Sequence, residues 1–360
     1  MRRFPNLENC LSLPYRTPVY NPIRMNELEN TIRKKTEIRL RDDVVKDLFD
    51  VYCDRGILEA VSQILYEVPQ EVLDPVIHTL GSHVTKEKPV FAYAVFQSIG
   101  QEEKTSVQVG AIVDLLWSFS LMYDDMFDQD LKRSGMPAAW VEFGSDQAYK
   151  SAQVGFEAVN LIANRYFGNE ASFKIDRLVG MGIESLKAHR DIKPGASIST
   201  LLDNYRLRAL FHTALPFVLI DQLPDDKNVA FLAVENVNLA GQIMNDLKDV
   251  SPKYIWLREG FSDIRSGVMS VPLSILLERL EPVDKMKILG LFGNCEMSES
   301  DRHFVTDSFI NTGALVDSIN MTKKIFDECL GQFHSFLKPE FYKYINEWIL
   351  SKTQQLDSLV

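Results

Sequence analysis

The sequence contains few cysteines and no long hydrophobic run. Its 360 residues include four widely spaced cysteines with no C-x-x-C pair, namely Cys10, Cys53, Cys295 and Cys329. A disulfide framework or a zinc site is therefore not expected, and this usage is typical of a reducing, cytoplasmic location. No apolar run reaches the roughly eighteen residues that a membrane span needs, and the N-terminus lacks the apolar core of a signal peptide.

The sequence also lacks an excess of positive charge and any low-complexity tract. Its formal net charge is −11, which disfavours nonspecific binding to nucleic acid through bulk charge. Apolar residues make up 46% and charged residues 25%, as in a soluble globular protein. The prolines of the first 24 residues, Pro5, Pro14, Pro18 and Pro22, predict an irregular N-terminal arm over residues 1–24.

After residue 24, alternating strand patterns are scarce and the 3.6-residue period of amphipathic helices dominates. Long periodic segments span residues 44–68, 107–130, 228–250 and 314–337. The sequence therefore predicts one all-α domain over residues 25–360. Bundled helices of this kind place polar sites in the clefts between them.

The segment YDDMFDQDLKRSGMP carries four aspartates at the end of a strongly apolar helix. Asp124 and Asp128 are one turn apart, and Asp125 adds a carboxylate on the neighbouring row. Trp117 and Leu121 share this face, so an apolar floor meets a carboxylate rim. Carboxylates this close favour a bound cation, and oxygen ligands suit Mg²⁺. The alternative is a solvated helix end, because charge runs usually face water.

A second apolar helix ends in a similar cluster, GQIMNDLKDVSPKY. Asn245 and Asp249 have i, i+4 spacing, Asp246 and Asp249 have i, i+3 spacing, and Gln242 lies one turn earlier. Two such helix ends predict oxygen ligands that face each other across a cleft.

Basic residues complete the predicted site. Lys132 and Arg133 follow the first acidic segment, and Arg208 lies in the otherwise apolar segment NYRLRALFHTALPF. A cation in apolar surroundings is costly unless it binds an anion, although an internal salt bridge would also satisfy Arg208. Metal ions and guanidinium groups around one cavity are typical of polyphosphate binding.

These segments resemble the motifs of the trans-isoprenyl diphosphate synthase and class I terpene synthase superfamily. DDMFD followed by KRSGMP is similar to D-D-x-x-D followed by R-R-G-x-P, and GQIMNDLKD is similar to F-Q-I-x-D-D-x-x-D. KEKPVF lies where the family has G-G-K-R-x-R-P, and YRLRALF lies where it has a K-T-containing helix. The order of the motifs agrees over residues 75–280.

The resemblance implies an isoprenoid synthase type I fold, which is a single helical bundle around a deep central cavity, and Mg²⁺-dependent ionisation of an allylic prenyl diphosphate. The implied metal ligands are Asp124, Asp125, Asp128, Asn245, Asp246 and Asp249. The implied diphosphate-binding residues are Lys86, Lys88, Lys132, Arg133, Arg208 and Gln242, of which Arg133 and Arg208 are catalytic. Trp117, Phe119 and Leu121 are expected in the cavity wall, with a purely core position as the alternative for Phe119.

The residues that seat a second diphosphate in elongating family members are largely changed. Ser134 replaces an arginine and Thr85 a lysine, while Lys86 and Lys88 stand where the family has arginines. Lysine does not reproduce the two-pronged grip of arginine on phosphate. Asn245 also replaces an aspartate. The pattern favours a class I terpene synthase (cyclase) that forms a terpene hydrocarbon and releases diphosphate.

Three alternatives stay open. One is a short-chain trans-prenyl diphosphate synthase with C10 to C15 products, which condenses isopentenyl diphosphate with an allylic diphosphate. The second is transfer of the prenyl cation to another acceptor, and the third is a noncatalytic subunit of a heteromeric synthase. The expected partners are a prenyl diphosphate and, as an option left open, a second copy of the chain in a homodimer. No nucleic acid and no integral membrane segment are expected.

Overall fold

The computed structural model describes residues 22–37, 43–82, 85–128, 130–221, 228–253, 260–294 and 296–359. The N-terminal arm predicted for residues 1–24 lies outside this part of the chain, except that residues 22–24 belong to the first helix.

The described residues are almost wholly helical, which confirms the all-α prediction. The N-terminal half contains α1 (Pro22–Glu37), α2 (Asp43–Asp54), α3 (Ile57–Tyr66), the 3₁₀ turn η2 (Gln70–Val72), α4 (Leu73–Ser82), α5 (Glu87–Ser98), α6 (Glu103–Asp128), α7 (Ala139–Phe143) and α8 (Ser145–Phe167). The C-terminal half contains α9 (Ala171–Asp191), α10 (Ile198–Leu219), α11 (Val229–Val250), α12 (Ser262–Ser266), α13 (Val271–Arg279), α14 (Pro282–Leu291), α15 (Glu299–Asn311), α16 (Ala314–Phe336) and α17 (Pro339–Asp357). A hairpin of β1 (Lys132–Arg133) and β2 (Met136–Pro137) follows α6.

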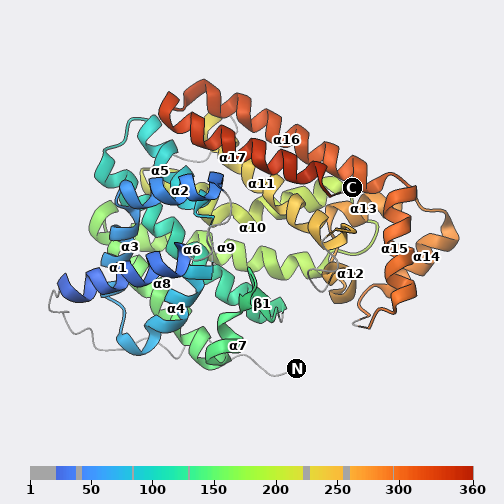
Figure 1. Ribbon diagram of the computed structural model, residues 1–360, viewed down its shortest axis with the longest axis horizontal. Helices are drawn as coiled ribbons and strands as arrows, with labels where there is room; N and C mark the ends of the chain where they lie inside the picture. Colours follow the sequence, from blue (N-terminus) through green and yellow to red (C-terminus); the bar gives the residue numbers. More distant parts are fainter. Residues whose placement is uncertain are drawn as a thin grey trace.

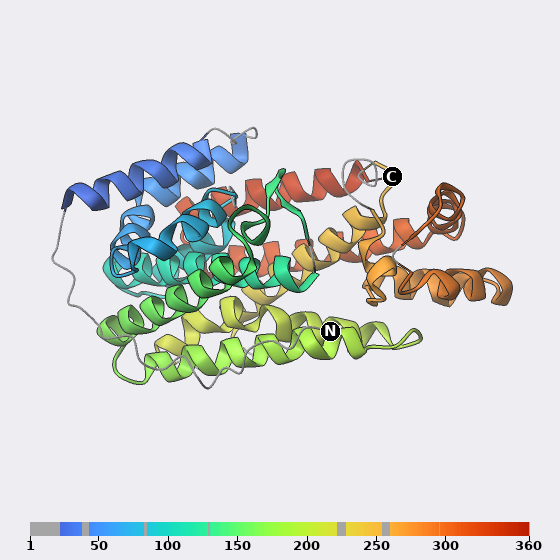
Figure 2. The same ribbon diagram turned by 90° about the horizontal axis from the view of Figure 1, so that it is seen from below.

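The helices form an elongated bundle. Figure 1 shows α16 and α17 along one long edge, α14 and α15 at one end, and α1 to α4 toward the other end. Figure 2 shows the same length from below, with α8 and α9 along the opposite side. Between them, α10 and α11 run antiparallel, because Tyr205 bonds to Asp246 while Thr213 bonds to Asn238. These two helices carry the predicted Arg208 and the second acidic motif.

Local sequence signals explain where these two helices begin. The hydroxyl of Ser197 accepts a hydrogen bond from the Thr200 amide (3.2 Å) at the start of α10. The side chain of Asn228 accepts from the amides of Ala230 and Phe231 (3.1 Å each) at the start of α11. Such caps satisfy backbone donors that have no partner within a helix. The cap of α11 lies at the end opposite the acidic motif, whereas the cap of the antiparallel α10 lies at the same end as that motif.

The central helix α6 carries the first acidic motif. Its segment Glu103–Met126 is, among the described residues, the one helix long and apolar enough to cross a membrane. However, 78% of its most apolar stretch is buried inside the bundle, which is the environment of a core helix. Composition alone therefore does not make it a membrane span.

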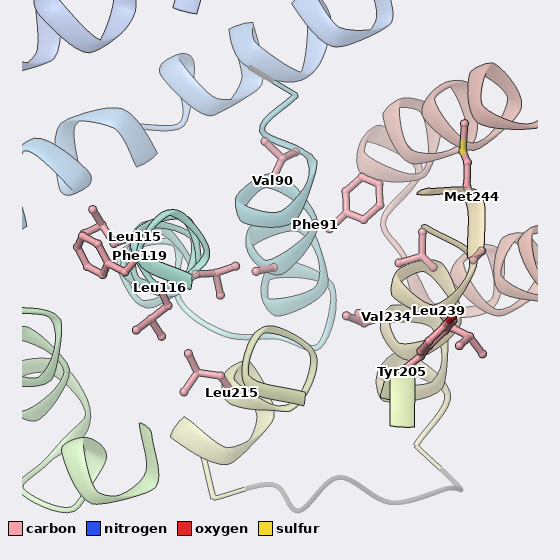
Figure 3. Close-up of a cluster of buried hydrophobic side chains, with 14 of the residues drawn as sticks. Val90, Phe91, Leu115, Leu116, Phe119, Tyr205, Leu215, Val234, Leu239 and Met244 are labelled. Atoms are coloured by element: carbon pink, nitrogen blue, oxygen red, sulfur yellow. The ribbon is translucent and has the colours of Figure 1, made fainter. Parts of the chain in front are cut away.

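Phe119 packs on the side of α6 that is turned away from α5 (Figure 3). Its ring is fully buried, and its centroid lies 5.3 Å from that of Phe156 on α8. Phe119 therefore belongs to the core between α6 and α8, which corrects its prediction as a cavity residue. Helical periodicity explains this position. Phe119 is two residues from both Trp117 and Leu121 and therefore points to the opposite face of α6.

Substitution Gly155→Ala is expected to lower the free energy of unfolding by about 1–3 kcal/mol through overpacking. A Cβ atom at Gly155 on α8 would overlap the Phe119 ring, which has no open side. Chemical denaturation measures the change. The control is Gly180→Ala on α9, where no atom lies within 4 Å and alanine should stabilise the helix. Equal effects of both substitutions would contradict the packing of Phe119.

Candidate active site

One cavity of about 390 Å³ opens between α5, α6, α10, α11, α16 and α17. Its polar rim includes Asp124, Arg133, Arg208 and Asn245, so both acidic motifs and both predicted catalytic arginines meet there. Its other end is apolar and is lined by side chains that include Phe91, Val95, Phe217, Val234 and Trp348. This combination suits a ligand with an anionic head and a hydrocarbon tail.

The first acidic motif presents Asp124 to the cavity. Asp125 is buried and pairs with Arg133, whose Nε lies 2.7 Å from the Asp125 Oδ1 atom. Arg133 also reaches Asp124, at 3.7 Å between Nη2 and Oδ2. Burial alone would lower the pKa of Arg133, but its hydrogen bond and ion pair with Asp125 outweigh burial and raise it. Asp128 ends α6, and its side chain lies outside the described residues.

The second acidic motif turns only part of its oxygen ligands to the cavity. Asn245 and Gln242 line the cavity, whereas Asp246 accepts a hydrogen bond from the Tyr205 hydroxyl at 2.5 Å. Burial raises the pKa of Asp246 to about 7, against the lowering effects of Tyr205 and Arg208. The carboxylate of Asp246 is thus hydrogen-bonded to α10.

The carboxylate of Asp249 binds the first residues of α12. Its carboxylate accepts hydrogen bonds from the Ser262 amide (2.9 Å), the Ser262 hydroxyl (2.8 Å) and the Asp263 amide (3.1 Å). Asp263 beside it is buried, and burial together with the charges of Asp249 and Asp246 raises its pKa well above the usual range. The three predicted metal ligands of this motif therefore differ in placement, and of these three Asn245 lines the cavity.

The donor set fits a divalent cation held jointly by protein and ligand. In the described ranges, no three His, Cys, Asp or Glu side chains converge closely enough to hold a metal by themselves. Mg²⁺ commonly binds through one or two carboxylates together with substrate phosphates and water. Asp124 on one wall and Asn245 on the other are compatible with that mode.

Arg208 lies on the cavity wall between the two motifs. Its Nε is buried, and among the described residues it has no hydrogen-bond partner. An unsatisfied buried donor of this kind is costly, and an anionic ligand in the cavity would satisfy it. The placement agrees with the predicted role of Arg208 as an anion-binding residue.

Two of the predicted diphosphate-binding lysines lie elsewhere. Lys132 is exposed on β1 and is not part of the cavity wall. Lys86 is fully buried, and its Nζ lies 3.0 Å and 3.2 Å from the carboxylate oxygens of Asp114 and 3.2 Å from the Leu80 carbonyl oxygen. The Tyr52 hydroxyl donates to the same carboxylate at 2.7 Å. The structure does not support diphosphate binding by Lys86, because its charge is neutralised inside the core.

Lys88 does reach the cavity, but at a deeper level. Its Nζ donates to the Asn238 Oδ1 atom (2.8 Å) and to the His212 Nε2 atom (3.2 Å), and it lies 4.1 Å from the centre of the Trp117 ring. Burial, and then the charge of Lys88, lower the pKa of His212 well below its usual range, so the imidazole is neutral and its Nε2 can accept. Trp117 and Leu121 line the cavity as predicted.

The titration of Lys88 is expected to appear in the pH dependence of stability. Burial lowers the pKa of Lys88 to about 8 in the folded protein, from a usual value of 10.5. Between these values the unfolded chain binds more protons, so stability rises with pH there, by at most about 3 kcal/mol. The stability of the wild type should therefore rise relative to that of Lys88→Met between pH 8 and 10.5 in denaturant titrations. A constant difference would contradict the buried ammonium.

Several cavity residues were not predicted from the sequence. Asn238 could have been found, because it precedes Gln242 and Asn245 on one face of α11. Lys248 on α11 and Lys352 on α17 also line the cavity, and Lys352 lies with its Nζ 5.1 Å from the centre of the Trp348 ring. No local motif marks Lys352, since its neighbours in the cavity are distant in sequence.

Comparisons with known proteins agree with this site. A polyprenyl synthetase family model matches residues 69–189. A short chain isoprenyl diphosphate synthase of Methanothermobacter thermautotrophicus is 25% identical over 67% of this chain and 77% of its own length. A geranylgeranyl diphosphate synthase of Sulfolobus acidocaldarius is 22% identical over 76% of this chain and 89% of its own length. The family model and these relatives are of the trans-isoprenyl diphosphate synthase superfamily, which is the superfamily that the motifs of this chain resemble.

Solved structures show the same fold. A decaprenyl diphosphate synthase from Rhodobacter capsulatus has a TM-score of 0.74 at 15% identity and covers 87% of this chain and 99% of its own. A polyprenyl synthase from Caulobacter crescentus CB15, complexed with calcium and isoprenyl diphosphate, has a TM-score of 0.70 at 18% identity and covers 86% and 96%. The isoprenoid synthase type I fold is thus confirmed.

Proposed function

We propose that the protein is a short-chain trans-prenyl diphosphate synthase, which joins isopentenyl diphosphate to an allylic diphosphate. The observation that carries the proposal is one cavity in which Asp124, Asn245, Arg133 and Arg208 form a polar rim above an apolar end. The relatives named above are all prenyl diphosphate synthases, which favours this alternative over the cyclase that the sequence pattern put first.

The chain's own residues bind and orient the allylic diphosphate. Mg²⁺ bound with the diphosphate would supply Lewis-acid stabilisation of the leaving group. Arg208 donates to the diphosphate oxygens, and Arg133, held between Asp124 and Asp125, supplies a second guanidinium at the rim. The allylic C–O bond breaks with its electron pair on the diphosphate. The alkene of isopentenyl diphosphate then forms the new C–C bond, and the resulting cation loses a proton to an oxygen of the released diphosphate.

The apolar part of the cavity protects the cation. Aromatic and aliphatic side chains around the hydrocarbon tail exclude water, which would otherwise add to the cation.

Two lysines of the cavity wall add positive charges that the motif comparison did not include. Lys248 and Lys352 line the cavity and can offset part of the charge lost at Ser134 and Thr85, which favours binding of a second diphosphate.

A terpene cyclase remains the second candidate. The observation that favours it is the burial of Lys86 against Asp114, which removes one more cation from the seat of a second diphosphate. Thr85 and Ser134, both in the cavity wall, are uncharged.

One experiment separates the two candidates. Purified protein is incubated with Mg²⁺ and geranyl, farnesyl or geranylgeranyl diphosphate, each with and without isopentenyl diphosphate. The proposed synthase yields a longer diphosphate only when isopentenyl diphosphate is present. A hydrocarbon formed from one allylic diphosphate alone would support the cyclase, and no turnover by the chain alone would support a noncatalytic subunit. The cytoplasmic location and the homodimer stay predictions.

A further inference from the structure

A carboxylate lies in the cavity wall below the polar rim. Glu87 is the first residue of α5, and its half-buried side chain lines the cavity. The ammonium of the adjacent Lys88 donates to Asn238, which precedes the rim residue Asn245 by seven residues on α11. At 1.5 Å per helical residue, this level lies about 10 Å along α11 from the rim. Glu87 therefore belongs to a part of the wall below both acidic motifs.

The C-terminal helix α17 packs against α5 beside this part of the cavity. The Lys338 amide at the start of α17 donates to the Ser98 hydroxyl at the end of α5 (3.1 Å). Further along, the ring centroids of Trp348 and Phe91 lie 5.2 Å apart. Because Trp348 follows Lys338 whereas Phe91 precedes Ser98, the two helices run antiparallel. The start of α5 therefore lies beside the later turns of α17.

This arrangement brings Glu87 and Lys352 to the same level of the wall. Glu87 is one turn before Phe91 on α5, and Lys352 is one turn after Trp348 on α17. Both side chains line the cavity. A carboxylate and an ammonium at one level offset each other, so Lys352 attracts an anion less than its own charge suggests.

The charge of Glu87 acts on other groups of the cavity. Burial lowers the pKa of Lys88, and the charge of Glu87 opposes this effect. Thr85 and Ser134, which stand where the resemblance places cations for a second diphosphate, line the same cavity and are uncharged. A second ligand therefore meets a negative charge in a wall that has lost two positive ones.

We propose that Glu87 determines how much negative charge the second ligand of the cavity can carry. This inference rests on the proposed function, in which that ligand is isopentenyl diphosphate. An alkyl diphosphate carries more negative charge than an alkyl monophosphate, and its extra phosphate would gain attraction from Lys352. Repulsion by Glu87 offsets this gain, because charges in a partly buried wall are screened less than in water.

The test measures binding of isopentenyl monophosphate and isopentenyl diphosphate by calorimetry, in wild type and Glu87→Gln. In the wild type the two ligands should bind within about threefold of each other, because attraction and repulsion of the extra phosphate nearly cancel. In Glu87→Gln the diphosphate should bind about tenfold more tightly than the monophosphate, because the amide is uncharged. The KM for isopentenyl diphosphate in elongation should fall in parallel, with kcat nearly unchanged.

The matched control is Glu347→Gln. Glu347 also lies on α17 but outside the cavity wall, so its replacement should leave the preference between the two ligands unchanged. If Glu87→Gln does not fold, Lys352→Met tests the same balance from the other side, and the monophosphate should then bind more tightly than the diphosphate. The same preference in wild type and cavity variant overturns the inference. Failure of the wild type to bind either isopentenyl ligand would instead reject the proposed function.

Discussion

Substitution of Asp124 by asparagine should lower kcat about 10³-fold, with the fold intact. Asp124 is the described carboxylate of the first motif that lines the cavity. Loss of its charge weakens the hold on a cation that stabilises the departing diphosphate, a contribution of several kcal/mol. Steady-state kinetics over a range of Mg²⁺ concentrations measures the effect, and excess Mg²⁺ should restore part of the activity.

The control for this substitution is Asp130→Asn. Asp130 is exposed and lies outside the D-D-x-x-D spacing, which predicts a solvated position. Its replacement should change kcat by less than about twofold, since its charge is screened by water. If Asp124→Asn keeps nearly full activity, the first motif does not hold the catalytic cation.

Lys86→Met should lower the free energy of unfolding by about 3–5 kcal/mol, because the buried carboxylate of Asp114 loses its counter-charge. Both side chains are inaccessible to solvent. The sequence resemblance instead implies a diphosphate-binding lysine, whose loss would weaken substrate binding without a large effect on stability. Urea denaturation and the KM for isopentenyl diphosphate, measured on the same variant, distinguish the two roles.

The double variant Lys86→Met with Asp114→Leu is the matched control. Replacing both charges by apolar side chains should recover most of the stability, apart from about 1 kcal/mol for the hydrogen bond from Tyr52. Retained stability in Lys86→Met, together with a raised KM, would restore the substrate-binding interpretation.

The arrangement of the rim could be predicted because it depends on short-range spacing. The D-x-x-D pattern and the apolar floor at Trp117 and Leu121 follow from helical periodicity, which α6 obeys. The same reasoning places Gln242 and Asn245 on one face of α11. Each motif ends an apolar helix, and the fold brings these two helix ends to one cavity.

The partners of charged side chains could not be predicted, because they come from distant segments. Asp114 lies 28 residues after Lys86, and Tyr205 lies 41 residues before Asp246. Asp249 bonds to the start of α12, a contact that the spacing of residues within the acidic motif does not indicate. Counting lost cations in the motifs likewise missed Lys352, whose helix α17 has no motif.

The roles of Asp246 and Asp249 bear on how the site binds its ligands. The Tyr205 hydroxyl accepts from the Val271 amide at 3.3 Å while it donates to Asp246, so α10, α11 and α13 meet at one phenol. Asp249 joins α11 to α12 in the same way. The wall that carries Asn245 is thus ordered by folding and not by the ligand. Such preorganisation removes part of the entropic cost of binding, and the empty enzyme should meet its substrate with this wall already rigid.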